Sequence, residues 1–315
     1  MKRVTLADIA RHCGVSVNTV SHALHDKPDI SDATKGLIRE AAQELGYIQN
    51  ASASFLRSGI SKSIAIILGD ISNPHFSIMV KEMEVIARSR GYTVFVLNTE
   101  EDEEIEREAI VASISKNVDG IIICPVQQSR NNIEFLLKSR VPFTLLGRRF
   151  PDLQTNYVVC DDEQSGYIAA EYIVKRNNQK TVILTTNDYV SSAKERLQGV
   201  RRFYEEKGIR WKPEDIYSVA LSSLKRGQEL KEISKSGYDS AICFNDILAL
   251  ELLSYAPGID IVSFDNIRSK FSMPYAFASV TSHKTRMSDC AIRILLDAIE
   301  GKKEPVQMVL PTRIS

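Results

Sequence analysis

From about residue 62 onward, short apolar runs alternate with longer amphipathic segments. Apolar runs of this length, each followed by a helix-like segment, are typical of parallel strands buried on both faces of a doubly wound sheet. The runs fall into two blocks that separate near residue 160. The sequence therefore predicts an α/β core of two Rossmann-like subdomains, with strands at 64–69, 92–97, 120–124, 143–147, 181–185, 240–244 and 260–264.

The first 48 residues have a helical periodicity instead. One helix is expected between Thr5 and Gly14, a second begins after Ser16, and a third begins after Ser31 and ends at Gly46. Serine and threonine are good residues for starting helices, and glycine readily adopts the left-handed conformation that ends them. The third helix is expected to cover the other two with Leu37, Ile38, Ala41, Ala42 and Leu45.

The short turn between the first two helices makes this segment a helix-turn-helix. A recognition helix reads base edges in the major groove with its N-terminal residues. On the outward face of the second helix, Asn18 suits adenine, Val17 suits a thymine methyl group, and His22 can donate to a guanine acceptor. The hydroxyl groups near the helix starts suit phosphates. They belong to Thr5, Ser16, Thr19, Ser21, Ser31 and Thr34.

Charge does not decide whether this segment binds DNA. Residues 1–58 contain seven Lys or Arg and six Asp or Glu, which is a weak electrostatic footprint for a DNA-binding protein. A three-helix module that packs against another protein is the alternative. If the segment binds DNA, two copies joined in a dimer are needed for tight binding.

Several motifs together resemble the lactose-repressor (LacI/GalR) family of bacterial transcription regulators. They are VTLADIARHCGVSVNTVSHAL in the headpiece, ELGYIQNASASFLR in the hinge, and GDISNPHF and CFNDILAL in the core, so the resemblance spans essentially the whole chain. It implies a core like a periplasmic sugar-binding protein. The family usually has arginine where His22 stands and proline where Gln49 stands, so the usual half-site cannot be assumed and the hinge helix is less preorganised.

The hinge sequence supports a switch. Residues 50–58 are too few to hold a helix in water alone, so we expect folding only with DNA and a partner hinge. The resemblance implies that Leu56 wedges into the central base step, whereas packing on the core is its alternative role; Phe55 is expected to pack on the partner hinge. We assign DNA contacts to Thr5, Leu6, Ser16, Val17, Asn18, Thr19, Ser21, His22, Ser31, Asn50, Ala53 and Leu56.

The change in periodicity and the motifs together predict three parts of the chain. They are a headpiece over 1–48, a hinge and linker over 49–61, and an effector-binding and dimerisation core over 62–315. The N-subdomain would comprise about 62–160 plus 282–311, and the C-subdomain about 161–281 plus 312–315.

Ligands of open α/β sheets bind beyond the carboxyl ends of strands. Residue chemistry at these ends and the resemblance together assign the effector site to Asp70, Asn73, His75, Phe76, Met79, Arg148, Arg196, Ser222, Asn245 and Asp265. Ser222 stands where the family often has an aromatic residue.

Composition sets further bounds. The chain has 40 basic and 40 acidic residues, and the acidic run at 100–108 is expected to be a solvated helix start. With no long apolar stretch and no apolar signal region, we expect no membrane span and a cytoplasmic location. The cysteines are expected to be reduced thiols. No catalytic residue, metal site or cofactor is predicted, because the sequence lacks GxGxxG after a strand, GxxxxGK[ST], HExxH and GxSxG.

The sequence thus predicts a DNA-binding transcription regulator, expected to repress carbohydrate-utilisation genes as a homodimer on a palindromic operator. A sugar-like effector between the subdomains would control it, either as an inducer or as a corepressor, and a phosphoprotein corepressor is a further candidate partner. Two other functions fit the sequence less well. A sugar-binding protein of a transport system conflicts with the headpiece and the missing signal region, and an enzyme conflicts with the missing motifs.

Overall fold

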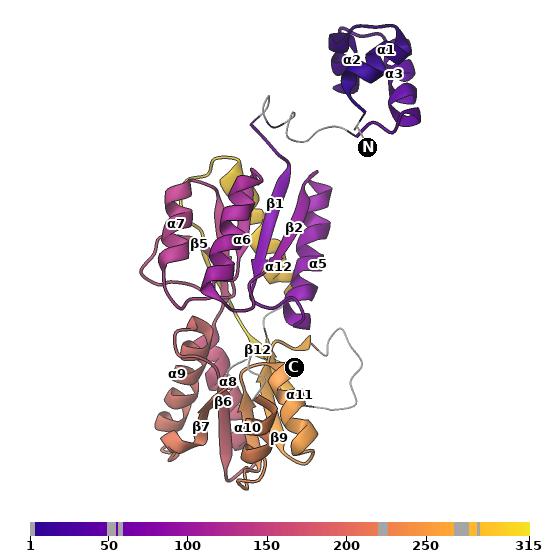
Figure 1. Ribbon diagram of the computed structural model, residues 1–315. Coiled ribbons are helices and arrows are strands. Elements are labelled where there is room, and N and C mark those ends of the chain that lie inside the picture. Colours follow the sequence, from indigo (N-terminus) through magenta and orange to yellow (C-terminus); the bar gives the residue numbers. More distant parts are fainter. Residues whose placement is uncertain (1–3, 49–54, 56–58, 220–225, 268–276, 282–283) are drawn as a thin grey trace. The chain divides into compact units, whose positions relative to one another are not determined.

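The computed structural model describes residues 4–48, 55, 59–219, 226–267, 277–281 and 284–315 (Figure 1). The chain divides into two compact units, Met1–Ser61 and Lys62–Ser315. Among the described residues, no helix is long and apolar enough to cross a membrane.

The described residues 4–48 of the first unit form helices α1 (Leu6–Cys13), α2 (Val17–Leu24) and α3 (Asp32–Glu44). The predicted helix ends are confirmed at Gly14, which has a left-handed backbone, and at Ser16 and Ser31, whose hydroxyls accept backbone N–H groups of the first turns. Ile9, Val20, Ala23 and Ile38 form the apolar core with the alanines of α3. The prediction for Leu37 is wrong: its side chain is 52% exposed, because Ile38, Ala41 and Ala42 already fill the buried face of α3.

The described residues of the second unit form two six-stranded sheets. The first sheet is entirely parallel, and its strand order places the reversal between β1 (Ser63–Leu68) and β3 (Gly120–Ile123). Helices α5 (Pro74–Ser89) and α12 (Lys284–Ile299) cover one face, and α6 (Glu103–Ser115) and α7 (Asn131–Ser139) cover the other. In spatial order the strands are β11 (Gln307–Leu310), β5 (Asn156–Cys160), β4 (Phe143–Leu146), β3 (Gly120–Ile123), β1 (Ser63–Leu68) and β2 (Thr93–Asn98).

The second sheet repeats this design, with one antiparallel edge strand. Helices α8 (Asp162–Lys175) and α9 (Ser191–Glu206) cover one face. Helices α10 (Arg226–Ile233) and α11 (Asp246–Tyr255) cover the other, and a 3₁₀ turn (Pro213–Asp215) precedes β7. In spatial order the strands are β12 (Arg313–Ile314), antiparallel to its neighbour, β10 (Ala278–Thr281), β9 (Asp260–Phe264), β8 (Ser240–Cys243), β6 (Thr181–Thr185) and β7 (Ile216–Ser218).

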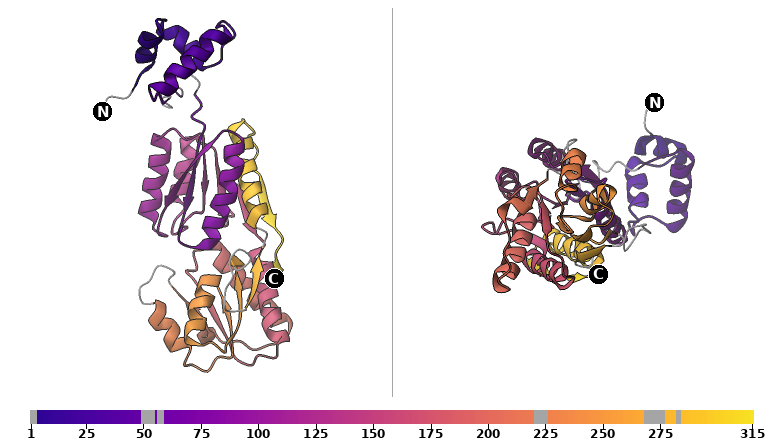
Figure 2. Two further views of the ribbon diagram at one scale, coloured as in Figure 1. Left: turned by 90° about the vertical axis from the view of Figure 1, so that its right-hand side faces the viewer. Right: turned by 90° about the horizontal axis from the view of Figure 1, so that it is seen from below.

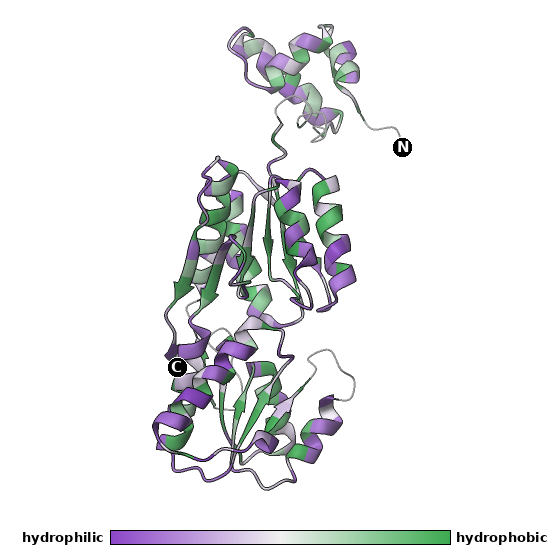
Figure 3. Ribbon diagram, turned by 90° about the vertical axis from the view of Figure 1, so that its left-hand side faces the viewer, coloured by the Kyte–Doolittle hydropathy of each residue, from purple (hydrophilic) through white to green (hydrophobic). Residues whose placement is uncertain are grey.

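By the order of the described elements, the chain passes between the two sheets from β5 to α8, from β10 to α12, and from β11 to β12. Helix α12 therefore follows a strand of the second sheet but packs against the first, where Figure 2 shows it in yellow. The strands are predominantly hydrophobic and lie between amphipathic helices (Figure 3), as the predicted α/β fold class requires. In such sheets the strand-order reversal opens a crevice at the carboxyl ends of the strands.

Candidate effector cavity and DNA-contact surface

A cavity of about 290 Å³ lies at the carboxyl ends of strands from both sheets. Most of the predicted effector residues line it. They come from the segments after β1, β4, β8 and β9 and from α9, and they are Asp70, Asn73, His75, Phe76, Arg148, Arg196, Asn245 and Asp265.

Among the predicted effector residues that the structure describes, Met79 is not part of this lining. Met79 is fully buried in the apolar core among β1, α5 and α12, because it lies one helical turn after Phe76 on the face of α5 that packs on the sheet. The prediction that Met79 contacts the effector is therefore wrong for this structure. Ser222 lies outside the described residues.

Helix capping positions the polar groups on the first side of the cavity. The Asn73 side chain accepts the backbone N–H of His75 at 2.9 Å, which starts α5 directly at the cavity. The Asp70 carboxylate accepts from both the backbone and the hydroxyl of Ser72, at 2.8 and 2.6 Å. The rings of His75 and Phe76 meet edge to face, so the α5 N-terminus presents both an aromatic surface and polar atoms.

Arg148 is buried and donates to both carboxylate oxygens of Glu101, at 2.7 and 2.8 Å, and to the carbonyl of Pro125 at 2.9 Å. Glu101 follows β2 with a left-handed backbone (φ 56°), which turns its side chain across Gly69. A Cβ at Gly69 would lie 2.2 Å from the Glu101 carboxylate. A side chain at position 69 would therefore have to displace the Glu101 carboxylate from its place beside Arg148.

Glu101 corrects the prediction for the acidic run at 100–108. Asp102, Glu103 and Glu104 do start α6 at the surface. Glu106, however, is buried, and its carboxylate accepts from the backbone of Val126 at 2.7 Å and from the side chain of Asn132. Burial raises the Glu106 pKa above its ordinary value, against the opposing effect of these hydrogen bonds. Part of the run is thus internal, because Glu101 pairs with Arg148 and Glu106 accepts from the segment after β3.

Arg196 forms a second buried ion pair on the other side of the cavity. Its Nε donates to Asp162 at 2.7 Å, and its Nη1 donates to the carbonyl of Phe244 at 2.8 Å. The guanidinium carbon lies 5.1 Å from the centre of the Phe244 ring and 4.3 Å from that of the Phe264 ring. Burial raises the Asp162 pKa to about 6, and the charge of Arg196 opposes that rise. Sequence reasoning missed Asp162 because β5, the strand before it, was not predicted.

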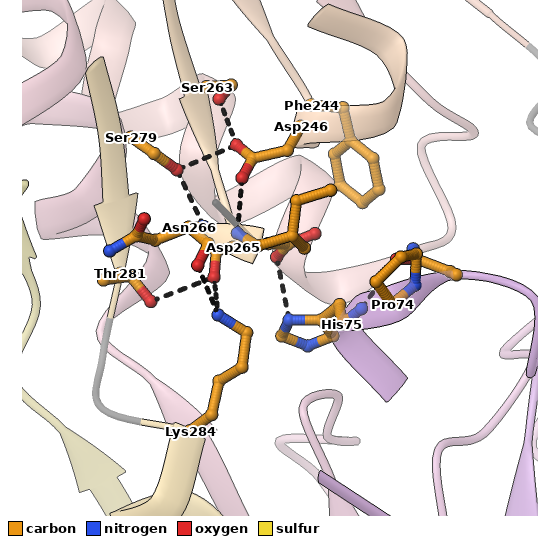
Figure 4. A network of polar contacts seen from close by, with 12 residues as sticks. Pro74, His75, Phe244, Asp246, Ser263, Asp265, Asn266, Ser279, Thr281 and Lys284 are labelled. Carbon is orange, nitrogen blue, oxygen red and sulfur yellow. Dashed lines mark hydrogen bonds and ion pairs between the residues drawn. The ribbon is translucent and has the colours of Figure 1, made fainter. Parts of the chain in front are cut away.

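A polar network holds Asp265 at the cavity (Figure 4). Its backbone has a φ of 97°, and its carboxylate lies 3.4 Å from His75 Nδ1 of the opposite subdomain. Lys284, from α12, donates to the backbone carbonyls of Asp265 and Asn266. Burial lowers the His75 pKa, while Asp265 opposes that change, so the imidazole is kept in its neutral form at pH 7.

Asp246 underlies this network. Its carboxylate accepts from the hydroxyls of Ser263 and Ser279 and from the backbone N–H of Ile267, joining β9, β10 and the segment that follows β9. Burial raises the Asp246 pKa to about 6, and nearby Asp265 adds to the rise. The N-cap of α11 is Asn245, whose side chain accepts from Leu248 N at 2.8 Å.

In the headpiece, the predicted DNA-contact residues lie on α2 and at the helix starts. Val17 is 46% exposed and Asn18 is exposed, whereas Ser21, His22 and Thr19 are half-buried. The Ser16 hydroxyl accepts from Thr19 N, and the backbone N–H of Thr5 donates to the Asp8 carboxylate. Leu6 packs against the headpiece core. Thr5, Ser16 and Ser31 are exposed, while Asn50, Ala53 and Leu56 lie outside the described residues.

Comparison with known proteins identifies both units. The model of bacterial regulatory proteins of the lacI family matches residues 5–50, and that of periplasmic binding proteins and the sugar binding domain of the LacI family matches residues 61–266. The HTH-type transcriptional repressor PurR of Aliivibrio fischeri (strain MJ11) is 25% identical over 311 residues, covering 95% of this chain and 92% of its own. These relatives are regulators rather than enzymes.

Solved structures share the fold. The Lac repressor dimer bound to operator and the anti-inducer ONPF superposes with a TM-score of 0.84 at 20% identity, covering 99% of this chain and 98% of its own. A complex of the transcriptional regulator CelR with cellobiose has a TM-score of 0.70 at 21% identity, with the same coverage. With its helix-turn-helix headpiece and its periplasmic-binding-protein-like effector domain, the chain belongs to the LacI family of bacterial DNA-binding regulators.

Proposed function

We propose that this regulator represses carbohydrate-utilisation genes and that an uncharged, sugar-like molecule in the cavity controls it. The observation that carries the proposal is the charge pairing of the cavity wall. Arg148, Arg196 and Arg226 each contact a carboxylate of the protein, from Glu101, Asp162 and Glu251 respectively. An anionic ligand would have to compete with these carboxylates for each guanidinium.

Other carboxylates and two aromatic rings of the lining also favour a neutral polar ligand. Asp70, Glu100 and Asp265 add carboxylates that accept hydrogen bonds from hydroxyl groups but repel phosphate or carboxylate groups. The rings of Phe76 and Phe244 supply apolar faces against which the C–H face of a sugar ring can pack. The cellobiose of the CelR complex is a neutral ligand of this chemical kind.

The test is a thermal-shift screen of the full-length protein with neutral mono- and disaccharides and with their phosphate esters, followed by calorimetry. A neutral sugar should raise the melting temperature with increasing concentration, and its phosphate ester should have a much smaller effect. Stabilisation by phosphate esters alone would reject the proposed ligand class.

We also propose that the first subdomain forms the homodimer, because β2 lies at the edge of its sheet and exposes apolar side chains. Strand β2 lies at the end of its sheet, and Phe95 and Val96 on it are exposed together with Val85 of α5 and Ile105 of α6. Unpaired edge strands with exposed apolar side chains favour association. A twofold dimer would present two headpieces to a palindromic operator in the cytoplasm.

An operator titration with and without sugar distinguishes the two signs of control, since the coupling between the sites is reciprocal. Weaker operator binding identifies an inducer, and stronger binding identifies a corepressor. A phosphoprotein corepressor belongs to the second case, and adding it should then strengthen operator binding.

The alternative function, a sugar-binding protein of a transport system, is not favoured because the DNA-binding model of the family matches residues 5–50.

A further inference from the structure

His22, on the outward face of α2, contacts an acidic residue of the next turn. Its Nδ1 lies 2.6 Å from Oδ2 of Asp29, which lies between α2 and α3. The His22 side chain is 36% exposed and that of Asp29 is 54% exposed, so the pair lies at the headpiece surface. His22 lies one helical turn after Asn18 and therefore on the same face of α2.

The chemistry of the partner decides which imidazole nitrogen carries a proton. The hydrogen bond from His22 lowers the pKa of Asp29, which keeps Asp29 a carboxylate. A carboxylate can only accept hydrogen bonds, so His22 Nδ1 must be the donor. In the neutral ring, the proton then sits on Nδ1, and Nε2 has a free lone pair and acts as an acceptor.

Nε2 as an acceptor recognises different bases than a protonated Nε2 that donates. In the major groove, adenine and cytosine present exocyclic amino donors at N6 and N4, whereas guanine presents only the acceptors N7 and O6. A neutral His22 whose Nδ1 is held by Asp29 therefore matches adenine or cytosine, not the guanine expected from the sequence.

We propose that Asp29 is a specificity-determining positioning residue, which holds His22 so that Nε2 accepts from an adenine or cytosine amino group in each half-site. The inference rests on the proposed role of His22 as a base reader. Asp29 acts through His22 and need not touch the base itself.

The substitution Asp29→Asn separates this role from a merely structural one. An asparagine amide can donate to Nδ1, which permits the tautomer with a proton on Nε2, so guanine becomes acceptable. Asp26→Asn is the matched control, because Asp26 is also an exposed carboxylate near this turn but contacts Lys35 and Arg39 of α3.

The experiment selects operator sequences from a randomised duplex library at pH 8 with the full-length protein and with the variants His22→Ala, Asp29→Asn and Asp26→Asn. The wild type should prefer adenine or cytosine at one position of each half-site, by roughly tenfold over guanine. Asp29→Asn should relax that position toward guanine and leave the other positions unchanged. His22→Ala should lose the preference there, and Asp26→Asn should keep it.

Other results would contradict the proposed role of His22, of Asp29, or of both. An unchanged selection with His22→Ala removes His22 from base reading, and with it the proposed contact. If His22→Ala changes the base preference at this position but Asp29→Asn does not, His22 remains a base reader and the proposed role of Asp29 is wrong. A wild-type preference for guanine, or an affinity loss with Asp29→Asn spread evenly over all positions, also overturns it. Thermal melting of each variant verifies that it is folded.

Discussion

Arg148 and Glu101 form a two-point ion pair that joins the end of β4 to the loop after β2 at the cavity wall. Only 6% of the Arg148 side chain is exposed, so its charge depends on the protein for compensation. The pair therefore has two effects. It stabilises the first subdomain, and it occupies a guanidinium that would otherwise be free to bind an anion.

Glu101→Ala should destabilise the core by about 3 kcal/mol, because it leaves Arg148 buried without its partner. It should also increase binding of sugar phosphates, since the guanidinium becomes available. Urea unfolding and calorimetry measure the two effects. Glu100→Ala is the control, as Glu100 lines the same cavity without contacting Arg148. Equal stability of the two variants would contradict the assigned importance of the pair.

Asp265→Ala should abolish the effector response while leaving operator binding within about twofold. The reason is that Asp265 lines the cavity and reaches toward His75 across the subdomains, whereas the headpiece is a separate unit. Operator titrations with and without the effector measure both properties. The control is Glu214→Ala, which removes an exposed carboxylate of the same subdomain outside this lining. A normal response in Asp265→Ala would exclude the residue from the site.

Asp246 should make the free energy of unfolding depend on pH in the acid range. Its pKa is about 6 in the folded protein against an ordinary value of 3.8, so the folded state binds the proton more tightly. Its contribution is fully present below pH 3.8 and is lost as pH rises through 6, by about 3 kcal/mol at most. Asp246→Asn should flatten this part of the profile, even though the variant is less stable throughout. Urea unfolding at pH 4.5 and 7 tests this. Identical pH slopes for the two proteins would refute it.

Gly166→Ala should destabilise the second subdomain by about 3 kcal/mol or more, since α8 and α9 cross closely there. A Cβ at Gly166 would lie 1.9 Å from the backbone oxygen of Arg196, so α9 must move and carry Arg196 with it. Effector affinity should fall as well. The control is Gly36→Ala in α3, where a Cβ has open space. If Gly166→Ala is as stable as that control, the close crossing is not required.

Phe95→Asp should convert the dimer to monomers and weaken operator binding by at least about tenfold, because a charge on the β2 edge opposes burial of that face. Sedimentation velocity measures the association state. Leu137→Asp, which changes an equally exposed apolar residue of α7, should leave the dimer intact. A dimer that survives Phe95→Asp must use another face.

Periodicity alone was enough to predict the three headpiece helices and the α/β class of the core. These are local properties: a strand buried on both faces must be apolar throughout, and a helix must repeat its apolar residues every turn. It was not enough for β5, β7, β10, β11 and β12, which are short or contain polar residues. Nor did it find that Leu37 is exposed, because neighbouring residues compete for one buried face.

Only the tertiary structure decided which charged residues of the candidate sites pair with one another. Glu101 meets Arg148, and Asp162 meets Arg196, because the strand order and the passages between the sheets bring distant segments to the same cavity. Likewise, Asp29 reaches His22 through the geometry of one turn. A charge in a sequence shows what a residue can bind. The fold decides whether that charged side chain is already ion-paired with another residue of the chain. Ion pairing and burial depend on where residues lie in space and not on residue type alone.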